Sequence, residues 1–401
     1  MKILTYTSLF PSSRRPLFGV FVFHRVVQLA KEQGNDVAVI APVPYFPRWI
    51  KSDTWGIYSE VPQRERFENL PVEHPRYPLL PGFLMPLHGF LMFLGSLAAA
   101  RRMHKEHHFE CIDAHYVYPD GFAAVLVGKV LGVPTVVSAR GTDINLFPSF
   151  RLIRPMIRWT LGQAAGLIAV SAALKESMVR LGVPKDKVVV IPNGVDVTRF
   201  HRMPRGEARQ KLGLACDFRM VVSVASLTEG KNHKLLISAF SKMAESGPPT
   251  RLYIIGEGPL RGDLERQVRS LSLENRVLFG GPRPNEELAL WFNAADVSCL
   301  VSAREGWPNV VTESIACGTP VVASRVGGIP EILVTPDLGV LVELGPDSIL
   351  EGLQRALSKE WNRDWLVHYA HSRSWTQVAT EVEAYLSTQI QRSDQQGQPT
   401  T

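Results

Sequence analysis

The sequence predicts an α/β protein made of two doubly wound, Rossmann-like domains. A chain of 401 residues is long for a single hydrophobic core. Short apolar runs, typical of buried parallel strands, alternate with segments of helical periodicity. This alternation occurs on both sides of a polar stretch from Asp196 to about Gly213, which we expect to be a linker. The expected domains are therefore residues 1–197 and 198–375, followed by an amphipathic helix at 376–392.

The first domain begins with a strand, a loop, a helix and a second strand. These segments are Ile3–Phe10, Pro11–Gly19, Phe21–Gln33 and Asp36–Ala41, and further strands are expected at Cys111–His115, Pro134–Ala139, Leu167–Ser171 and Val188–Ile191. Open α/β sheets bind ligands at the carboxyl ends of their strands, so the loops after them are the candidate sites. A dinucleotide oxidoreductase would need Gly-x-Gly-x-x-Gly after the first strand, and residues 11–20 lack it.

The most informative stretch of the second domain is Ser302–Glu313, which follows an apolar strand at Val297–Val301. The pattern predicts a loop that contains Glu305, then a helix over Val310–Cys317 with Asn309 as its N-cap and Gly318 as its left-handed stop. Free N–H groups at a helix N-terminus attract anions, and carboxylates accept hydrogen bonds from sugar hydroxyls. The stretch thus fits a phosphorylated sugar ligand, although two solvated surface acids would give the same pattern.

Four motifs occur in one order along the chain. They are Ile191–Asp196, Gly256–Leu260, the two glutamates Glu305 and Glu313 eight positions apart within Glu305–Ser314, and Val326–Glu331. Together they resemble the retaining nucleotide-sugar glycosyltransferases of family 4. The resemblance implies the GT-B fold, in which two Rossmann-like domains face each other across a cleft and the C-terminal helix returns to the first domain. The first domain would then take the acceptor and the second the nucleotide-sugar donor.

The resemblance also implies roles for individual residues. Glu313 would hold the ribose hydroxyls, Lys231 and the amides of Val310 and Val311 the diphosphate, and Glu305 with the 306–309 backbone the sugar. In the first domain, His115 would approach the donor sugar. The implied catalytic residues are His115, Glu305 and Lys231, and the implied donor-binding residues are Gly19, Arg140, Asp143, Ser226, Lys231, Gly281, Arg283, Glu305, Gly306, Trp307, Pro308, Asn309, Val310, Val311 and Glu313.

The chain departs from the family pattern in its phosphate loops. Relatives usually carry Gly-Arg and then Lys-Gly after the first strand of the second domain, whereas this chain has Ala225-Ser226 and Lys231-Asn232. Lys231 is therefore the expected side-chain cation of that loop. The loop after the first strand of the chain has one glycine, Gly19, where many relatives have two.

The expected reaction needs no cofactor beyond the donor substrate. Some transferases hold a divalent metal with Asp-x-Asp, and the sequence contains no two aspartates at that spacing. The four cysteines show no Cys-x-x-Cys spacing, so we predict no metal site. In retaining members of the family the donor's own phosphate is thought to take the acceptor proton, so no general base is expected.

Charge is distributed unevenly between the halves of the chain. Residues 1–200 contain 23 Lys and Arg against 15 Asp and Glu (+8), and residues 201–401 contain 21 against 23 (−2). A basic first half suggests an anionic surface or acceptor. Nucleic acid is not expected, because no basic run is interleaved with aromatic residues and no binding motif occurs.

The segment Tyr77–Ala100 is uncharged, but Pro78, Pro81 and Pro86 argue against a membrane-spanning helix. The part from Leu87 to Ala100, which ends at basic residues 101–105, fits two interpretations. It is a core helix with a solvated end, or an interfacial helix beside an anionic membrane. Because residues 1–10 lack the apolar region of a signal peptide, we expect a cytoplasmic protein, peripheral at the inner face of the membrane under the second interpretation.

These observations predict a glycosyltransferase that moves a sugar from a nucleotide-diphosphate sugar to a carbohydrate or lipid-linked acceptor. Cell-envelope or exopolysaccharide synthesis is the process that we expect it to serve. Two alternatives share the fold: a GT-B sugar-nucleotide epimerase, and a non-catalytic protein that binds nucleotide sugars. The residues around Glu305 and Glu313 are not those expected of the epimerase. Hydrolysis of the donor in the absence of acceptor would distinguish an enzyme from a binding protein.

Overall fold

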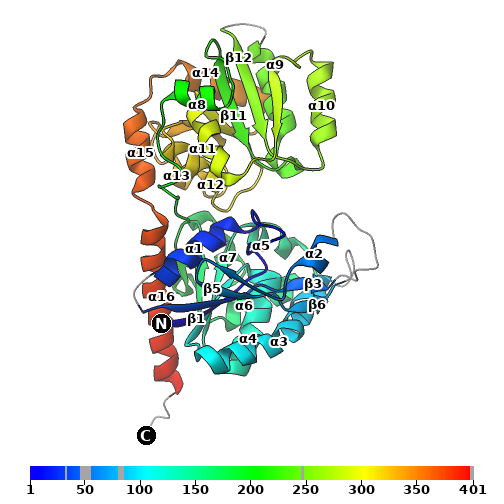
Figure 1. Ribbon diagram of the computed structural model, residues 1–401, viewed down its shortest axis with the longest axis vertical. Coiled ribbons are helices and arrows are strands. Elements are labelled where there is room, and N and C mark those ends of the chain that lie inside the picture. The colour runs from blue at the N-terminus through cyan, green and yellow to red at the C-terminus, as the bar shows by residue number, and fades with distance from the viewer. Residues whose placement is uncertain (32–33, 46–55, 80–84, 245–247, 398–401) are drawn as a thin grey trace. The chain divides into compact units, whose positions relative to one another are not determined.

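The computed structural model describes residues 1–401 apart from 32–33, 46–55, 80–84, 245–247 and 398–401 (Figure 1). The chain forms two compact units. Unit 1 contains Met1–Asn193 and Trp375–Thr401, and unit 2 contains Gly194–Ser374. The sequence predicts these boundaries after residue 197 and before residue 376, close to those of the two units.

Unit 1 is built on an eight-stranded sheet in the order β10-β9-β8-β7-β1-β2-β5-β4. β4 runs antiparallel to β5, and the other neighbouring strands are parallel. Every residue of β7 and β8 is buried, as expected for strands covered on both faces. The strands are β1 (Lys2–Tyr6), β2 (Asp36–Ile40), β4 (Arg64–Phe67), β5 (Leu70–Glu73), β7 (Cys111–His115), β8 (Thr135–Ala139), β9 (Gly166–Ala169) and β10 (Val188–Val190), with β3 (Val43–Tyr45) and β6 (Arg76–Pro78) in a separate parallel pair.

The helices of unit 1 cover this sheet, and the last helix of the chain is one of them. Val378, Val382 and Leu386 of that helix pack in the same core as Val22 and Val26 of α1. The C-terminal segment thus completes unit 1, as Figure 1 shows. The helices are α1 (Val20–Lys31), α2 (Gly56–Glu60), α3 (His88–His107), α4 (Phe122–Leu131), α5 (Thr142–Asn145), α6 (Arg154–Gln163), α7 (Ala172–Arg180) and α16 (Trp375–Gly397).

Unit 2 is a parallel six-stranded sheet in the order β13-β12-β11-β14-β15-β16. Its strands are β11 (Arg219–Val224), β12 (Thr250–Ile255), β13 (Val277–Gly281), β14 (Val297–Leu300), β15 (Val321–Ser324) and β16 (Gly339–Val342). Its helices are α8 (Arg205–Lys211), α9 (His233–Ala244), α10 (Arg261–Ser270), α11 (Asn285–Ala294), α12 (Asn309–Ala316), α13 (Ile329–Ile332), α14 (Pro346–Ser358) and α15 (Arg363–His371). Separate cores form on the two faces of the sheet, which confirms the prediction of two Rossmann-like, doubly wound sheets.

The polar stretch expected as a linker is instead part of unit 2. Phe200 and Ala208 lie in its core, and Arg209 is 3% exposed. The Arg209 guanidinium donates hydrogen bonds to Phe218 O (2.9 Å) and to the Asp296 carboxylate (3.0 Å). The prediction of a linker was wrong, because a charged residue such as Arg209, which the sequence suggests is solvated, is buried and bonded to residues farther along the chain.

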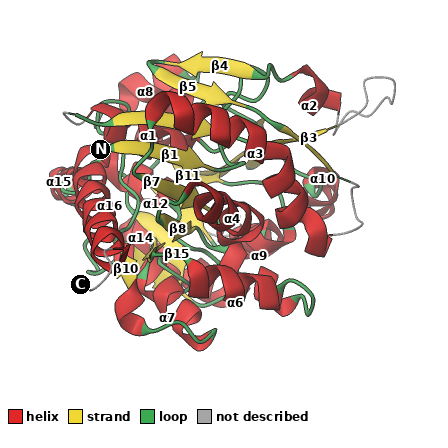
Figure 2. Cartoon of the chain, turned by 90° about the horizontal axis from the view of Figure 1, so that it is seen from below, coloured by secondary structure: helices red, strands yellow, loops and turns green. Residues whose placement is uncertain are grey.

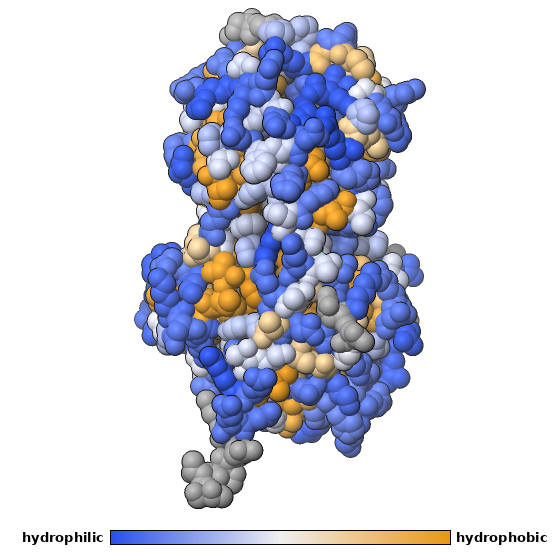
Figure 3. All heavy atoms as spheres, turned by 90° about the vertical axis from the view of Figure 1, so that its left-hand side faces the viewer, coloured by the Kyte–Doolittle hydropathy of each residue, from blue (hydrophilic) through white to orange (hydrophobic). Residues whose placement is uncertain are grey.

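Helix α3, which contains most of the uncharged segment, has a buried side and an exposed apolar side, so the choice between the core and the interfacial interpretation stays open. Its residues Met92, Ala99 and Met103 are buried, whereas Phe90 and Leu94 are 46% and 52% exposed. Pro81 of the same segment lies outside the described residues. Among the described helices, none is both long and apolar enough to cross a membrane. Figure 3 draws another face of the chain, where hydrophilic atoms surround separate apolar patches.

Candidate active site

Loops of unit 2 meet at the carboxyl edge of its sheet. The loop after β11 is joined to the loop after β12 by a hydrogen bond from Leu227 N–H to Glu257 O (2.9 Å). It is joined to the loop after β14 by a bond from Ala303 N–H to Gly230 O (2.8 Å). Ligand sites of open parallel sheets lie at this edge, so these connections bring the predicted donor-binding segments together.

Two of the predicted catalytic residues are in direct contact. Lys231 ends a short 3₁₀ turn, Glu229–Lys231, and its Nζ lies 2.5 Å from Glu305 Oε1 in the loop after β14. The side chains are 26% and 11% exposed, so the pair is accessible at one side. The structure thus places a cation and a carboxylate, from loops 74 residues apart, at one point of the sheet edge.

The backbone around Glu305 is supported by a glycine in the loop after β15. Gly327 has a φ of +53°, and a Cβ at this position would lie 2.0 Å from Glu305 O. The next residue, Gly328, donates its N–H to Gly306 O at 3.2 Å. The glycines of the motif Val326–Glu331 therefore allow the backbone of the loop after β15 to pack directly against the backbone of the loop that carries Glu305.

Helix α12 begins one residue earlier than predicted. It spans Asn309–Ala316, and Pro308 is its N-cap with φ −77° and ψ 103°. The prediction of Asn309 as N-cap was wrong, because the fixed φ and extended ψ of a proline make the turn into the helix instead. Gly318, at φ +74°, is the predicted left-handed stop. Gly306 and Pro308 are buried, so the segment that leads into α12 is fixed.

The first turns of α12 contain the amides and the acid assigned to the donor. The Val311 N–H donates to Pro308 O (3.0 Å), so this amide is already engaged. Glu313 is half-buried. Burial raises the pKa of its carboxyl to about 7, with Arg199 lowering the pKa and Asp196 raising it. Glu313 therefore changes charge near neutral pH.

The segment predicted to border the base is ordered by its own backbone. Gly281 has a φ of +70°, and its carbonyl accepts a hydrogen bond from Gly256 N–H (2.9 Å). The exposed Arg283 folds back onto Gly280 O (2.9 Å). This loop is thereby tied to the loop after β12.

Two further predicted donor residues differ in exposure. Ser226, which replaces the usual arginine, is exposed on the loop after β11. Trp307 is half-buried against the core on one face of the sheet. Its indole N–H is buried and has no partner among the described residues, so a hydrogen-bond acceptor is lacking there.

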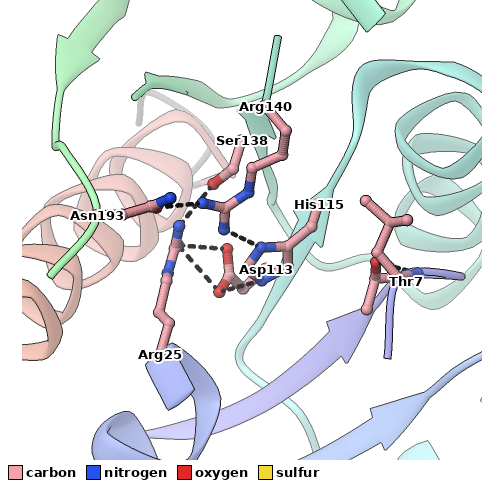
Figure 4. Close-up of polar contacts among 8 residues, drawn as sticks. Thr7, Arg25, Asp113, His115, Ser138, Arg140 and Asn193 are labelled. Carbon is pink, nitrogen blue, oxygen red and sulfur yellow. Dashed lines mark hydrogen bonds and ion pairs between the residues drawn. The ribbon is translucent and has the colours of Figure 1, made fainter. Parts of the chain in front are cut away.

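In unit 1 the structure places His115 inside a buried polar network (Figure 4). Asp113, on the same face of β7, accepts hydrogen bonds from Arg25 (2.8 and 3.1 Å) and lies 3.1 Å from His115 Nε2. Arg25 also donates to Ser138 Oγ (2.9 Å). On the other side of the ring, the Arg140 guanidinium contacts His115 Nδ1. Both ring nitrogens of His115 therefore have partners inside unit 1.

These contacts define the protonation state of the imidazole. Since Arg140 can only donate, Nδ1 accepts, and Nε2 carries the proton that it donates to Asp113. Burial lowers the pKa of His115 to about 3, which Asp113 opposes and Arg140 and Arg25 reinforce. Burial alone would raise the pKa of Asp113, but Arg25, His115 and Arg140 together outweigh burial and bring that pKa to about 2. His115 is thus neutral and Asp113 is ionised at neutral pH.

Arg140 and Asp143 form the loop after β8. The Asp143 carboxylate accepts the N–H groups of Val117 (2.8 Å), Arg140 (3.1 Å) and Gly141 (2.7 Å). Arg140 donates a further bond to Asn193 Oδ1 at 2.9 Å. Burial lowers the pKa of Arg140 to about 9, so it stays cationic at neutral pH. Asp143 shapes the loop, and Arg140 is its partly exposed cation.

Gly19 supports the loop after β1. Its φ is +67°, and a Cβ there would lie 2.3 Å from Leu9 O, so any other residue would push the start of α1 away from this loop. The same loop is anchored by Asp120, whose carboxylate accepts the Ser8 N–H. Burial raises the pKa of Asp120 to about 7.

Sequence reasoning missed Arg25, Asp113, Ser138 and Asn193. Asp113 could have been found, because residues two apart on a strand face the same side, as Asp113 and His115 do. Arg25 lies 88 residues from Asp113, and no local pattern connects them. The predicted residues thus form two groups: Lys231, Glu305 and the start of α12 in unit 2, and His115, Arg140 and Asp143 in unit 1.

No group of three or more His, Cys, Asp or Glu side chains that could hold a metal ion occurs in the described part of the chain. The described cysteines are free, and Cys111, Cys299 and Cys317 are buried.

Comparisons with known proteins agree with these features. The family model "Glycosyltransferase Family 4" matches residues 19–199, and "Glycosyl transferases group 1" matches residues 204–373. The putative teichuronic acid biosynthesis glycosyltransferase TuaC of Bacillus subtilis (strain 168) is 29% identical over 337 residues, which cover 83% of each chain. An uncharacterized glycosyltransferase of Methanocaldococcus jannaschii is 34% identical over 276 residues, 65% of this chain and 70% of the relative.

Among solved structures, Anabaena HepE in complex with UDP and glucose superposes with a TM-score of 0.72 at 20% identity. The match covers 97% of this chain and 100% of that protein, which supports the two-sheet architecture along the whole length. The chain therefore belongs to the family 4 glycosyltransferases and has their GT-B fold.

Proposed function

We propose that this protein is a retaining glycosyltransferase that moves a sugar from a nucleotide-diphosphate sugar to a carbohydrate or lipid-linked acceptor. The observation that carries the proposal is the contact between Lys231 Nζ and Glu305 Oε1 beside the start of α12. A cation and a helix N-terminus suit a diphosphate, and a neighbouring carboxylate suits the hydroxyls of the sugar attached to it. HepE, which shares the fold, was solved with UDP and glucose, and a UDP-sugar is accordingly the first donor to test.

The roles of the unit 2 residues follow from their positions. When the donor binds, the Lys231 ammonium exchanges its contact with Glu305 for a contact with the diphosphate. Glu305 then accepts a hydrogen bond from a sugar hydroxyl. Glu313 accepts the ribose hydroxyls as a carboxylate. The loop that ends at Arg283 borders the base. Stabilising the charge of the leaving diphosphate is the main task of such a site, and Lys231 with the Val310 amide at the start of α12 performs it without a metal ion.

His115 takes part as a positioning residue in this proposal. Its ring is neutral and both nitrogens are engaged, which does not suit a general base. It holds the guanidinium of Arg140 instead, and Arg140 adds positive charge at the carboxyl edge of unit 1. In the proposed retaining reaction the donor phosphate takes the acceptor proton, so His115 need not act as a base.

The acceptor is proposed to bind to unit 1. A cavity of about 200 Å³ lies beside the loop after β1 and is lined mainly by apolar and aromatic side chains. Arg15 adds a cation to its wall and stacks on Phe18, 3.8 Å from the ring centroid. Aromatic rings stack on sugar rings, and a guanidinium binds an acidic substituent, so the wall suits a sugar with a negative charge.

A peripheral membrane contact through α3 forms part of the proposal. Leu87, the N-cap of this helix, is 45% exposed, and Phe90 and Leu94 within it are 46% and 52% exposed. The exposed Arg101, Arg102 and Lys105 follow near its end. Apolar side chains next to cations are typical of helices that lie in the surface of an anionic membrane. A lipid-linked acceptor would be reached there, on the cytoplasmic side, in cell-envelope or exopolysaccharide synthesis.

The test is transfer from labelled UDP-sugars to a membrane extract, with NMR analysis of the anomeric configuration of donor and product. The proposal expects a labelled glycolipid or glycan whose new bond keeps the donor configuration. An inverted bond would refute the retaining reaction. Conversion of the nucleotide sugar into its epimer would support the epimerase, and binding without hydrolysis or transfer would support the non-catalytic protein.

A further inference from the structure

A second cavity lies in unit 1, at the edge of the sheet opposite to His115 and Arg140. Its volume is about 640 Å³, and it is lined where β8, β9 and β10 begin and by the later part of α16. Figure 2 shows α4, α6 and α16 around the near ends of β8 and β10. The carboxyl-edge residues of the candidate active site do not line it.

Two buried polar groups in the wall of this cavity lack partners. Gln389 of α16 is 3% exposed, and its Nε2 has no hydrogen-bond partner among the described residues. Thr135 is 5% exposed, and its Oγ1 likewise has no hydrogen-bond partner among the described residues. A buried polar group without a partner destabilises a fold. The two groups therefore indicate a hydrogen-bonding ligand.

The surrounding wall is fixed and accommodates these groups. Gly128 makes room for the Thr135 hydroxyl, since a Cβ at Gly128 would lie 2.2 Å from Oγ1. The Tyr385 hydroxyl accepts the Leu167 N–H (3.1 Å) and donates to Lys187 O (3.1 Å). Because the tyrosine is satisfied within the protein, the missing partners are specific to Gln389 and Thr135.

Positive charge dominates the rim. Lys129 and Arg392 are exposed, and Lys187 is half-buried with its Nζ bonded to Gly162 O (2.6 Å). Asp186 is the one acid in the lining among the described residues. Three cations against one carboxylate favour an anion, and the buried amide and hydroxyl favour a ligand that also carries hydroxyl groups.

We infer that this cavity binds a phosphorylated monosaccharide. The phosphate of the ligand lies against Lys129 and Arg392. The hydroxyl groups of the ligand accept a hydrogen bond from the Gln389 amide and form another with the Thr135 hydroxyl. A volume of 640 Å³ falls within the roughly 300–1,000 Å³ typical of small-molecule sites. The site is separate from the donor site, because its residues lie in unit 1 where the strands begin, and it does not depend on the proposed transfer reaction.

Calorimetric titration of the full-length protein with glucose 1-phosphate tests the inference, with inorganic phosphate and glucose as separate titrants. The wild-type protein is expected to bind glucose 1-phosphate more tightly than either fragment. Lys129→Glu/Arg392→Glu should weaken this binding by at least about 10-fold, as expected for charge-assisted contacts. The matched control is Arg151→Glu/Arg154→Glu, which changes two exposed arginines of unit 1 outside the cavity and should bind as the wild type.

Thr135→Val tests the buried hydroxyl without changing its shape. The variant should bind glucose 1-phosphate several-fold more weakly, while its thermal midpoint without ligand should not fall, since an unpartnered hydroxyl is removed. Lys231→Ala should leave this binding unchanged, and the cavity variants should leave nucleoside diphosphate binding unchanged, so a failure here is distinct from a failure of the proposed function. The inference is overturned by no binding in the wild type, by equal binding in Lys129→Glu/Arg392→Glu, or by equal binding of phosphate, which would mean an adventitious ion only.

Discussion

Lys231 and Glu305 neutralise one another in the free chain. Their contact of 2.5 Å is only partly shielded from water, so its net contribution to stability is small. A diphosphate offers Lys231 more negative charge than Glu305 does, and the lysine can change partners at little cost. Under the proposed function, the pair keeps the cation in place until a donor binds.

Lys231→Ala should lower affinity for a nucleoside diphosphate by at least about 10-fold, because a charge-assisted contact worth about 1.5–3 kcal/mol is removed. Since Ser226 replaces the usual arginine, no second cation of this loop can share the phosphate charge. Affinity is measured by calorimetric titration. Lys234→Ala, which changes an exposed lysine three residues later, is the control and should bind normally. Unaltered binding by Lys231→Ala would mean that the phosphates lie elsewhere.

Glu313 should make stability and donor binding depend on pH in opposite ways. Its pKa is raised by burial to about 7, so between its unfolded pKa near 4.5 and pH 7 the native state binds more protons than the unfolded state. The free energy of unfolding contributed by Glu313 therefore falls as pH rises through this window. Glu313→Gln should be stabilising by about 1–3 kcal/mol at pH 8 and nearly neutral at pH 4.5, by urea denaturation.

The same variant should bind nucleoside diphosphate about 10-fold more weakly at pH 8, where the wild-type carboxylate accepts the ribose hydroxyls. The difference between wild type and variant should shrink at pH 6, where Glu313 is mostly protonated. An affinity ratio that does not change with pH would contradict the assignment of Glu313 to the ribose.

At the scale of elements, the loop after β15 packs against the loop that carries Glu305 and supports it. Gly327→Ala would place a Cβ 2.0 Å from Glu305 O at a φ of +53°. We expect a fall of several degrees in the thermal midpoint, and at least a 10-fold loss of sugar transfer as Glu305 moves, since the strain is on the order of 1–3 kcal/mol. Gly345→Ala is the control, because nothing lies within 4 Å of a Cβ at that position. Equal midpoints in the two variants would show that the loops do not support each other.

The exposed face of α3 is tested by Phe90→Ser/Leu94→Ser. The protein should sediment with anionic liposomes at low salt, less so at high salt, and the double variant should lose most of this binding. Leu271→Ser removes an exposed leucine of unit 2, 40% exposed, and should sediment like the wild type. A wild-type protein that stays in the supernatant at low salt would show that the face has no membrane role.

At the scale of the whole molecule, each unit repeats one plan. A parallel sheet buries apolar strands and exposes its polar groups in the loops at the carboxyl edge. In unit 2 these groups include Lys231, Glu305 and the start of α12. In unit 1 the network around His115 is buried, and Arg140 is its partly exposed cation. Under the proposed function, unit 2 takes the donor and unit 1 takes the acceptor.

Transfer by the intact protein should persist in EDTA. In the proposed function, Lys231 and the start of α12 supply the positive charge that a metal ion would otherwise supply, and the sequence lacks Asp-x-Asp. The measurement is the rate of sugar transfer in excess EDTA and after addition of Mg²⁺ or Mn²⁺. A rate that EDTA abolishes and either ion restores would contradict metal-independent chemistry.

Some features of this protein were determined by the sequence alone. The strand, loop and helix around Glu305 and Glu313, and the stop at Gly318, follow from residues within one short stretch. Apolar runs, a proline at a helix entry and a glycine at a helix end act on their immediate neighbours. Local order of this kind can be predicted because both interacting partners lie in the same window of sequence.

Other features were decided by the tertiary structure. Arg25 satisfies Asp113, Arg140 engages His115, and Arg209 makes a core segment of the stretch that looked like a linker. Each of these buried charges has a partner in the folded protein, and a buried charge without a partner would be strongly unfavourable. The partners are far apart in the sequence. The sequence names both partners but does not show that they are close in space. Folding brings them together, because each group can be buried at low cost only when it is paired with the other.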